Sequence, residues 1–105
     1  MNEIDTPVIK QMPAFKKAYK KLHKQYQLKV NEAIKEIIAD PKIGEEKKGD
    51  LSDIYVYKFK VDRQQILLAY EWNPQERILI ALGVHENFYR DLKRNRRQTL
   101  RCWYT

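Results

Sequence analysis

The residues best suited to chemistry on a phosphate lie just after the apolar run RILIALG. His85 comes two residues after Gly83, and Tyr89 and Arg90 follow it closely. Histidine has an ordinary pKa near neutral pH, so His85 could move protons as a general acid or base. Tyr89 could stack on an unpaired base, and Arg90 could contact phosphate. The structural alternative is that His85 only caps a helix that begins near Glu86.

Cations that suit the same chemistry lie in an earlier segment, IYVYKFKV. Lys58 and Lys60 alternate there, so they share one face of the predicted strand, whereas Tyr57 and Phe59 share the other. Arg63 follows in the turn after this strand. These three side chains could hold and polarise a phosphate backbone. Alternatively, they are the solvated charges of a two-sided strand and its turn.

The composition argues against several other kinds of site. The chain has one cysteine, Cys102, and two histidines, so we predict no zinc cluster and no cofactor. A single cysteine cannot form an internal disulfide, which fits a reducing cytoplasm. No apolar stretch approaches the roughly 18 residues needed to cross a bilayer. The N-terminus lacks the features of a secretory signal, so we expect a cytoplasmic protein with no membrane partner.

The charge of the chain points to a polyanionic partner. The 105 residues include 21 lysines and arginines, and the formal net charge is +7. Neutralising phosphates releases condensed counterions and drives binding, so nucleic acid is one candidate partner. An acidic protein that covers the basic surface is the other, and charge alone does not choose between them. His23 lies on a lysine-rich segment and is expected to be a surface residue.

The elements that must position these residues follow from the spacing of apolar side chains. We expect a short strand within residues 5–12, a basic amphipathic helix over 13–26, a second helix from 28 that ends at Asp40-Pro41, strands at 54–61, 65–72 and 77–83, and a short helix over 86–94. Short turns join the three strands into an antiparallel meander. The prediction is one α+β domain over residues 1–105 in the order β-α-α-β-β-β-α, with both N-terminal helices packed on a mostly antiparallel small sheet. Residues 95–105 form a basic tail to which we assign no structure.

Several strings in this order resemble one known family. They are AIKEIIADP, KKGDL leading into a Tyr-rich strand, YKFKV followed by a turn and LLAYE, and LIALGVHENFY. Together, over residues 8–94, they resemble the RelE/ParE superfamily of toxins from bacterial type II toxin–antitoxin systems. The resemblance implies a RelE-like fold. The tail after Arg94 lies outside it.

The resemblance implies one of two activities. RelE-like toxins are endoribonucleases that cleave messenger RNA without a metal, usually on the ribosome, and so arrest translation. ParE-like toxins share the fold but poison DNA gyrase. Members of both branches are inhibited by a cognate antitoxin protein, which would be a partner of this chain. We expect an mRNA endoribonuclease, with a gyrase inhibitor and a binding module without poisoning activity as the alternatives.

The resemblance also implies roles for the residues described above. In the histidine-using RelE-like nucleases, a Gly-x-His followed four residues later by an aromatic carries the catalytic histidine, and His85 with Tyr89 matches this spacing. By the same resemblance, Lys58 completes the catalytic group, and the RNA-binding residues would be Lys60, Arg63 and Arg90.

Two departures from RelE weaken this assignment. RelE has an arginine in the strand after the turn, where this chain is apolar within residues 65–67, and His85 stands where RelE has a second arginine. Either a histidine-centred variant operates, or catalysis is weak or absent.

Overall fold

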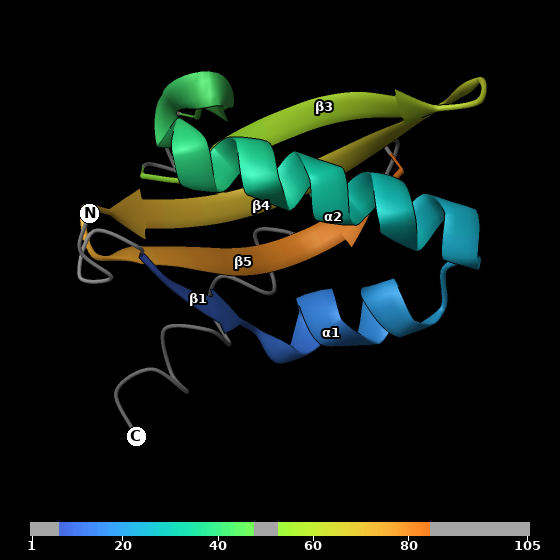
Figure 1. Cartoon of the computed structure of the whole chain (residues 1–105), viewed down its shortest axis with the longest axis horizontal. Coiled ribbons are helices and arrows are strands. Elements are labelled where there is room, and N and C mark those ends of the chain that lie inside the picture. Colours follow the sequence, from blue (N-terminus) through green and yellow to red (C-terminus); the bar gives the residue numbers. More distant parts are fainter. Residues whose placement is uncertain (1–6, 48–52, 85–105) are drawn as a thin grey trace.

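The computed structural model describes residues 7–47 and 53–84, which form two helices on one face of a five-stranded sheet (Figure 1). The elements are β1 (Val8–Gln11), α1 (Pro13–Lys20), α2 (Lys24–Ala39), the 3-10 helix η2 (Pro41–Ile43), β2 (Glu45–Glu46), β3 (Tyr55–Val61), β4 (Gln64–Asn73) and β5 (Glu76–Gly83). The spatial order of the strands is β1-β5-β4-β3-β2.

The sheet is mostly antiparallel. Strands β3, β4 and β5 form a meander with tight turns, and β2 adds two residues to the outer edge of β3. Only β1 runs parallel to its neighbour, β5. A parallel pair needs a long crossover connection, and the segment from α1 to β4 supplies it.

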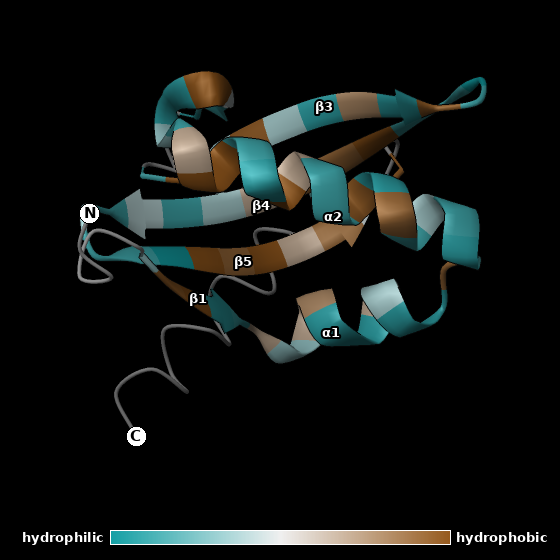
Figure 2. Cartoon of the chain, in the orientation of Figure 1, coloured by the Kyte–Doolittle hydropathy of each residue, from teal (hydrophilic) through white to brown (hydrophobic). Residues whose placement is uncertain are grey.

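The helices pack on one face of this sheet through the apolar stripes that the sequence predicts. Phe15 of α1 and Val30, Ala33 and Ile37 of α2 are buried. They belong to one core cluster with buried side chains of the strands, namely Val61, Ile66, Leu68, Tyr70, Leu79 and Leu82. Figure 2 shows apolar residues concentrated in the central strands and polar residues on the exposed surface of the helices.

The opposite face of the two central strands is also buried. A second core cluster contains Met12, Ile54, Val56, Leu67, Ala69, Ile78, Ile80 and Ala81. Strands buried on both faces are expected to be continuous apolar runs rather than alternating ones. This explains the sequences ILLAY in β4 and ILIAL in β5.

The structure confirms the predicted fold, but the boundary between the helices is wrong in the prediction. Helix α1 ends at Lys20 and α2 begins at Lys24, whereas we expected one helix over residues 13–26. The Leu22 N–H donates to the Tyr19 carbonyl, which tightens the last turn of α1, and His23 is extended at φ −62° and ψ 156°. The Gln27 side-chain amide then donates to the same Tyr19 carbonyl. These hydrogen bonds stabilise the end of α1, so the chain can leave the helix between Lys20 and Lys24 without a glycine or proline there.

The segment after α2 is more ordered than the polar loop that we expected over residues 41–53. It contains η2 and the short strand β2, and Tyr70 of β4 holds it in place. The Tyr70 hydroxyl donates to the Pro41 carbonyl at 2.6 Å and accepts the Gly44 N–H at 3.0 Å. Residues 86–94, where a helix is predicted, and the basic tail lie outside the described residues. In the part of the chain that the structure describes, no helix is long and apolar enough to cross a membrane.

Candidate functional site

Lys58 and the end of β5 lie in one row across the sheet. Lys58 of β3 is opposite Leu67 of β4, and Leu67 is opposite Gly83, the last residue of β5. Neighbouring strands are about 5 Å apart, so the backbones of Lys58 and Gly83 are about 10 Å apart. The segment that follows Gly83 therefore begins two strands away from Lys58.

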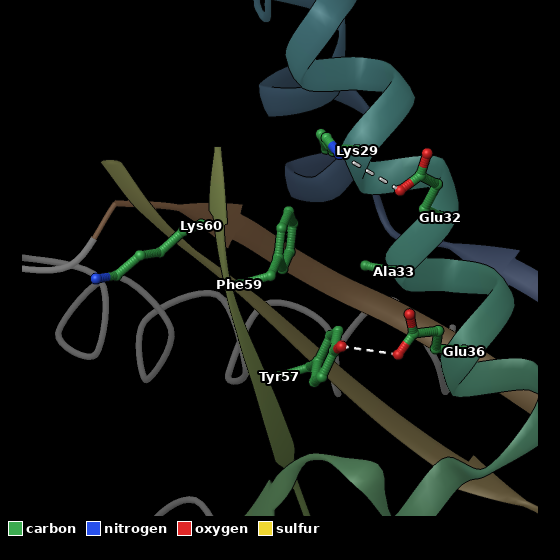
Figure 3. Close-up of a pocket in the computed structure, with 7 residues that line it drawn as sticks. All are labelled: Lys29, Glu32, Ala33, Glu36, Tyr57, Phe59 and Lys60. Atoms are coloured by element: carbon green, nitrogen blue, oxygen red, sulfur yellow. Dashed lines mark hydrogen bonds and ion pairs between the residues drawn. The ribbon is translucent and has the colours of Figure 1, made fainter. Parts of the chain in front are cut away.

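Lys58 and Lys60 share one face of β3, as predicted, and the structure shows that this face lies opposite the helices. The intervening Tyr57 and Phe59 pack with the helix-side cluster, whereas both lysines are exposed. In Figure 3, Phe59 and Tyr57 point toward α2, and Lys60 points away from it. The two ammonium groups are thus fixed on one rigid strand and open to an anionic ligand.

Glu45 is the carboxylate that pairs with Lys58 in the described part of the chain. Its Oε1 lies 4.0 Å from the Lys58 Nζ and 3.3 Å from the Lys47 Nζ. The Lys58 side chain is 44% exposed, and an exposed pair at this distance contributes little stability. A phosphate could therefore displace Glu45 at low cost. The sequence prediction missed Glu45 because β2 was expected to be loop.

The other side of β3 forms a pocket of about 160 Å³ against α2. The residues that line it are Lys29, Glu32, Ala33, Glu36, Tyr57, Phe59 and Lys60 (Figure 3). The Tyr57 hydroxyl donates to Glu36 at 2.9 Å, and burial, together with this carboxylate, raises the pKa of Tyr57. The lining thus carries two carboxylates and two ammonium groups, and the Lys29 Nζ lies 3.8 Å from the Glu32 Oε1. The pocket is close to neutral, whereas the opposite face of β3 carries the exposed Lys58.

Arg63 lies farther along, in the turn between β3 and β4. This turn contains Asp62 in the left-handed region, at φ 58°. The Gln25 side-chain amide donates to the Asp62 carboxylate at 3.0 Å, and Arg63 lines an open hollow together with Tyr26 of α2. The structure thus places Arg63 beside the first turn of α2, three residues beyond Lys60, and not in the Lys58 row.

The remaining predicted site residues, His85, Tyr89 and Arg90, lie outside the described residues. The described chain ends with Val84, whose side chain is 46% exposed. Among the described residues, no group of three or more His, Cys, Asp or Glu side chains could hold a metal ion.

Arg77 of β5 is a buried charge that the sequence analysis did not single out. Its guanidinium donates to the carbonyls of Ile37 and Ile38, at the C-terminal end of α2, and to the Asn73 carbonyl. It also lies over the Trp72 ring, 5.8 Å from its centroid. Burial lowers the pKa of Arg77 from its ordinary value, but a guanidinium stays charged at any physiological pH. A cation that satisfies the last carbonyls of a helix is structural.

The sequence matches the model of one known protein family. Residues 9–93 match the family model described as the ParE-like toxin of type II bacterial toxin–antitoxin systems. The chain belongs to the ParE-like toxin family. This toxin is thus one component of a type II toxin–antitoxin system, as its resemblance to the RelE/ParE superfamily implied. Among curated proteins, no significant sequence match to the toxin was found.

Solved structures show the same fold at low sequence identity. The toxin is similar to an arginine double mutant of E. coli RelE in the free state, with a TM-score of 0.67, 15% identity, and coverage of 86% of the toxin and 93% of the RelE chain. A chain of the intact E. coli RelBE toxin–antitoxin complex matches with a TM-score of 0.63 and 18% identity, and the match covers 76% of the toxin and 98% of that chain. A chain of the RelBE2 complex from Mycobacterium tuberculosis matches with a TM-score of 0.65 and 12% identity, and the match covers 76% of the toxin and 99% of that chain. At these identities the likeness establishes a RelE-like fold.

Proposed function

We propose that this toxin is a metal-independent endoribonuclease that cleaves messenger RNA and arrests translation in the cytoplasm. The observation that carries the proposal is the row that joins Lys58, Leu67 and Gly83. It brings an exposed cationic strand face to the strand end from which His85 follows. The similarity of the fold to RelE structures supports the RNA-cleaving branch.

In the proposed reaction, the ribose 2′-hydroxyl attacks the adjacent phosphate and releases the 5′-oxygen of the next nucleotide. His85 moves a proton as general acid or base. Lys58 stabilises the charge that develops on the phosphoryl oxygens, because a fixed cation needs no reorganisation during the reaction. Lys60 and Arg90 hold neighbouring phosphates, and Tyr89 positions the scissile nucleotide by stacking.

The proposal predicts arrest of cell-free protein synthesis by the purified toxin. His85→Ala should abolish the arrest, since general acid–base catalysis typically contributes about 10²–10⁴-fold. Lys58→Ala should weaken the arrest by a comparable factor, because one lost electrostatic contact to a developing oxyanion costs about 10²–10³-fold. The measurement is the rate of reporter synthesis against toxin concentration.

Lys42→Ala is the matched control for Lys58→Ala. Lys42 is an exposed lysine of η2, outside the proposed site, so this variant should arrest synthesis as the wild type does. Equal arrest by wild type and His85→Ala would refute the role given to His85. Equal loss in the Lys42 and Lys58 variants would show that only net charge matters.

Inhibition of DNA gyrase is the second candidate function. The family model that matches the toxin is ParE-like. In addition, residues 65–67 contain no arginine, whereas the resemblance implies one in this strand of an RNA-cleaving RelE-type site. A supercoiling assay with purified gyrase separates the two functions, because only this one predicts loss of supercoiling.

A cognate antitoxin is the partner that we propose for this toxin. The RelBE structures contain toxin–antitoxin complexes. A toxin with a net charge of +7 would attract an acidic antitoxin through long-range steering. Binding to the product of an adjacent small gene should therefore weaken as the salt concentration rises.

A further inference from the structure

The positive charge of the toxin is distributed unevenly along its sequence. Residues 7–31 contain seven lysines and neither aspartate nor glutamate. The other 14 of the 21 lysines and arginines are balanced by the 14 aspartates and glutamates of the whole chain. The segment that forms β1, α1 and the beginning of α2 thus carries a local charge of +7, and residues 90–101 are a second basic segment, with six basic residues and one acid. A general need for solubility would not require such a concentration.

The structure places five of these lysines on one continuous helical surface. We call it the helical lysine surface; it consists of Lys16, Lys17, Lys20, Lys21 and Lys24, all exposed. The apolar residues of α1, with Phe15 fully buried, face the sheet, so the lysines occupy the solvent side. Figure 2 shows this polar surface along α1 and at the start of α2, around the turn that joins them.

The lysines of this surface have no counter-ions among the described residues. No aspartate or glutamate in residues 7–47 or 53–84 forms an ion pair with any of them. Lys16 and Lys20 are four residues apart, as are Lys17 and Lys21, and like charges at this spacing repel each other across one helix turn. The arrangement therefore lowers the stability of the free toxin. An external polyanion would relieve this repulsion.

The first turn of α2 adds to the positive potential instead of reducing it. Lys24 is the first residue of α2, and the turn contains no acid. The N-cap residue, His23, makes no side-chain capping bond. A cation at the N-terminus of a helix interacts unfavourably with the helix dipole. Lys24 therefore does not stabilise α2. Arg63 lies beside this turn and lines the same hollow as Tyr26, together with Asp62, whose carboxylate accepts a hydrogen bond from the Gln25 amide. The surface therefore ends at the β3–β4 hairpin, where an acid accompanies the arginine.

The composition of this surface suits phosphate better than protein. Protein interfaces are centred on aromatic and apolar anchors and are depleted in lysine. None of the exposed large hydrophobic residues of the described chain lies on α1. Evenly spaced ammonium groups on a rigid helix match the sequence-independent contacts that proteins make with a nucleic-acid backbone.

We propose that the helical lysine surface is a second RNA-binding site, which holds the phosphate backbone of double-stranded RNA. It lies on the helix side of the sheet, whereas Lys58 and Lys60 project from the opposite face. Folded RNA could bind the helices while a single strand occupies the cleavage face. The choice of RNA over DNA rests on the proposed function.

The test is binding of a fluorescein-labelled RNA duplex of 16 base pairs, measured by anisotropy between about 50 and 200 mM salt. Lys17→Gln/Lys21→Gln should bind at least tenfold more weakly at 100 mM salt. The logarithmic salt slope should fall by about two, since each phosphate contact contributes roughly 0.9. Lys17→Arg/Lys21→Arg should bind like the wild type. The melting temperature of the Gln variant should be unchanged or higher, because repulsion is removed.

The matched control is Lys35→Gln/Lys42→Gln, which removes the same charge from exposed positions on α2 and η2. It should keep the wild-type salt slope. An equal loss in this control, or no binding by the wild type at 50 mM salt, would overturn the proposal. Equally tight binding to a DNA duplex of the same sequence would overturn the assignment to RNA.

Messenger cleavage, assayed in parallel, separates the two proposals. A toxin that binds duplex RNA through these lysines but cleaves no message would retain the second site and lose the proposed function. Conversely, normal cleavage with no duplex binding would overturn the second site alone.

Discussion

Tyr70 shows how much one side chain contributes to the position of a distant segment. It is fully buried in β4, and its hydroxyl bonds to both Pro41 and Gly44 of the segment that leads to β2. That segment carries Glu45, which lies close to Lys58. Burial raises the pKa of Tyr70 to about 12, although the bond from the Gly44 N–H partly opposes the shift. Tyr70 therefore remains a neutral donor throughout the neutral range.

This pKa predicts a loss of stability in alkaline solution. From about pH 10 the unfolded chain releases the Tyr70 proton, whereas the folded toxin retains it up to about pH 12. The free energy of unfolding should thus fall as the pH rises through this window, by about 2 kcal/mol from this side chain. Urea unfolding at several pH values measures it.

Tyr70→Phe is the matched variant for this measurement. At pH 7 it should lower the free energy of unfolding by about 1–3 kcal/mol, because the Pro41 carbonyl and the Gly44 N–H lose their partner. Between pH 10 and 12 it should lose less stability than the wild type. Parallel pH curves for the two proteins would contradict the account of Tyr70.

At the level of elements, Gly44, the residue after η2, lies tightly against side chain and backbone of β4 and β3. A Cβ at this position would lie 2.7 Å from the Tyr70 hydroxyl and 3.1 Å from the Val56 carbonyl carbon. We predict that Gly44→Ala costs about 1–3 kcal/mol of stability, as overpacking typically does. In Gly44→Ala/Tyr70→Phe the hydroxyl contact is absent, so the double variant should be less destabilised than the sum of the single variants. Denaturant unfolding of the four proteins gives the coupling energy, and strict additivity would disprove the contact.

Periodicity predicts the elements of this fold well, because most of their apolar residues are buried in the two core clusters. It failed at the α1–α2 boundary, where no glycine or proline marks the break and the Gln27 side chain takes over a backbone contact. It also missed β2, since two glutamates carry no strand signal. The register shift after Ala69 was equally hidden, because Ile80 and Ala81 are both apolar.

For the described residues of the candidate site, the sequence predicted local strand geometry but not the contacts that depend on tertiary structure. Strand alternation predicted that Lys58 and Lys60 share one face of β3, and the structure confirms that they do. Arg63 was expected in the same groove, but the hairpin turn is bonded to α2 through Asp62, and this contact depends on tertiary structure. The buried role of Arg77 was likewise invisible, because its acceptors are carbonyls about 40 residues earlier in the chain.

At the level of the whole molecule, the sheet separates two cationic surfaces. The face with Lys58 and Lys60 leads toward the end of β5. The helices α1 and α2, on which the helical lysine surface lies, are on the other face (Figure 1). Such a distribution would let the toxin hold folded RNA and a single-stranded message at once. Both contacts should weaken steeply with salt.

Cleavage of messages by the toxin is tested most directly by mapping the 5′ ends of RNA in a cell-free translation reaction. Wild-type toxin should produce new ends inside translated messages, in register with the reading frame, and His85→Ala should produce none. Intact messages together with loss of gyrase supercoiling would contradict the proposed function and establish the gyrase-directed function instead.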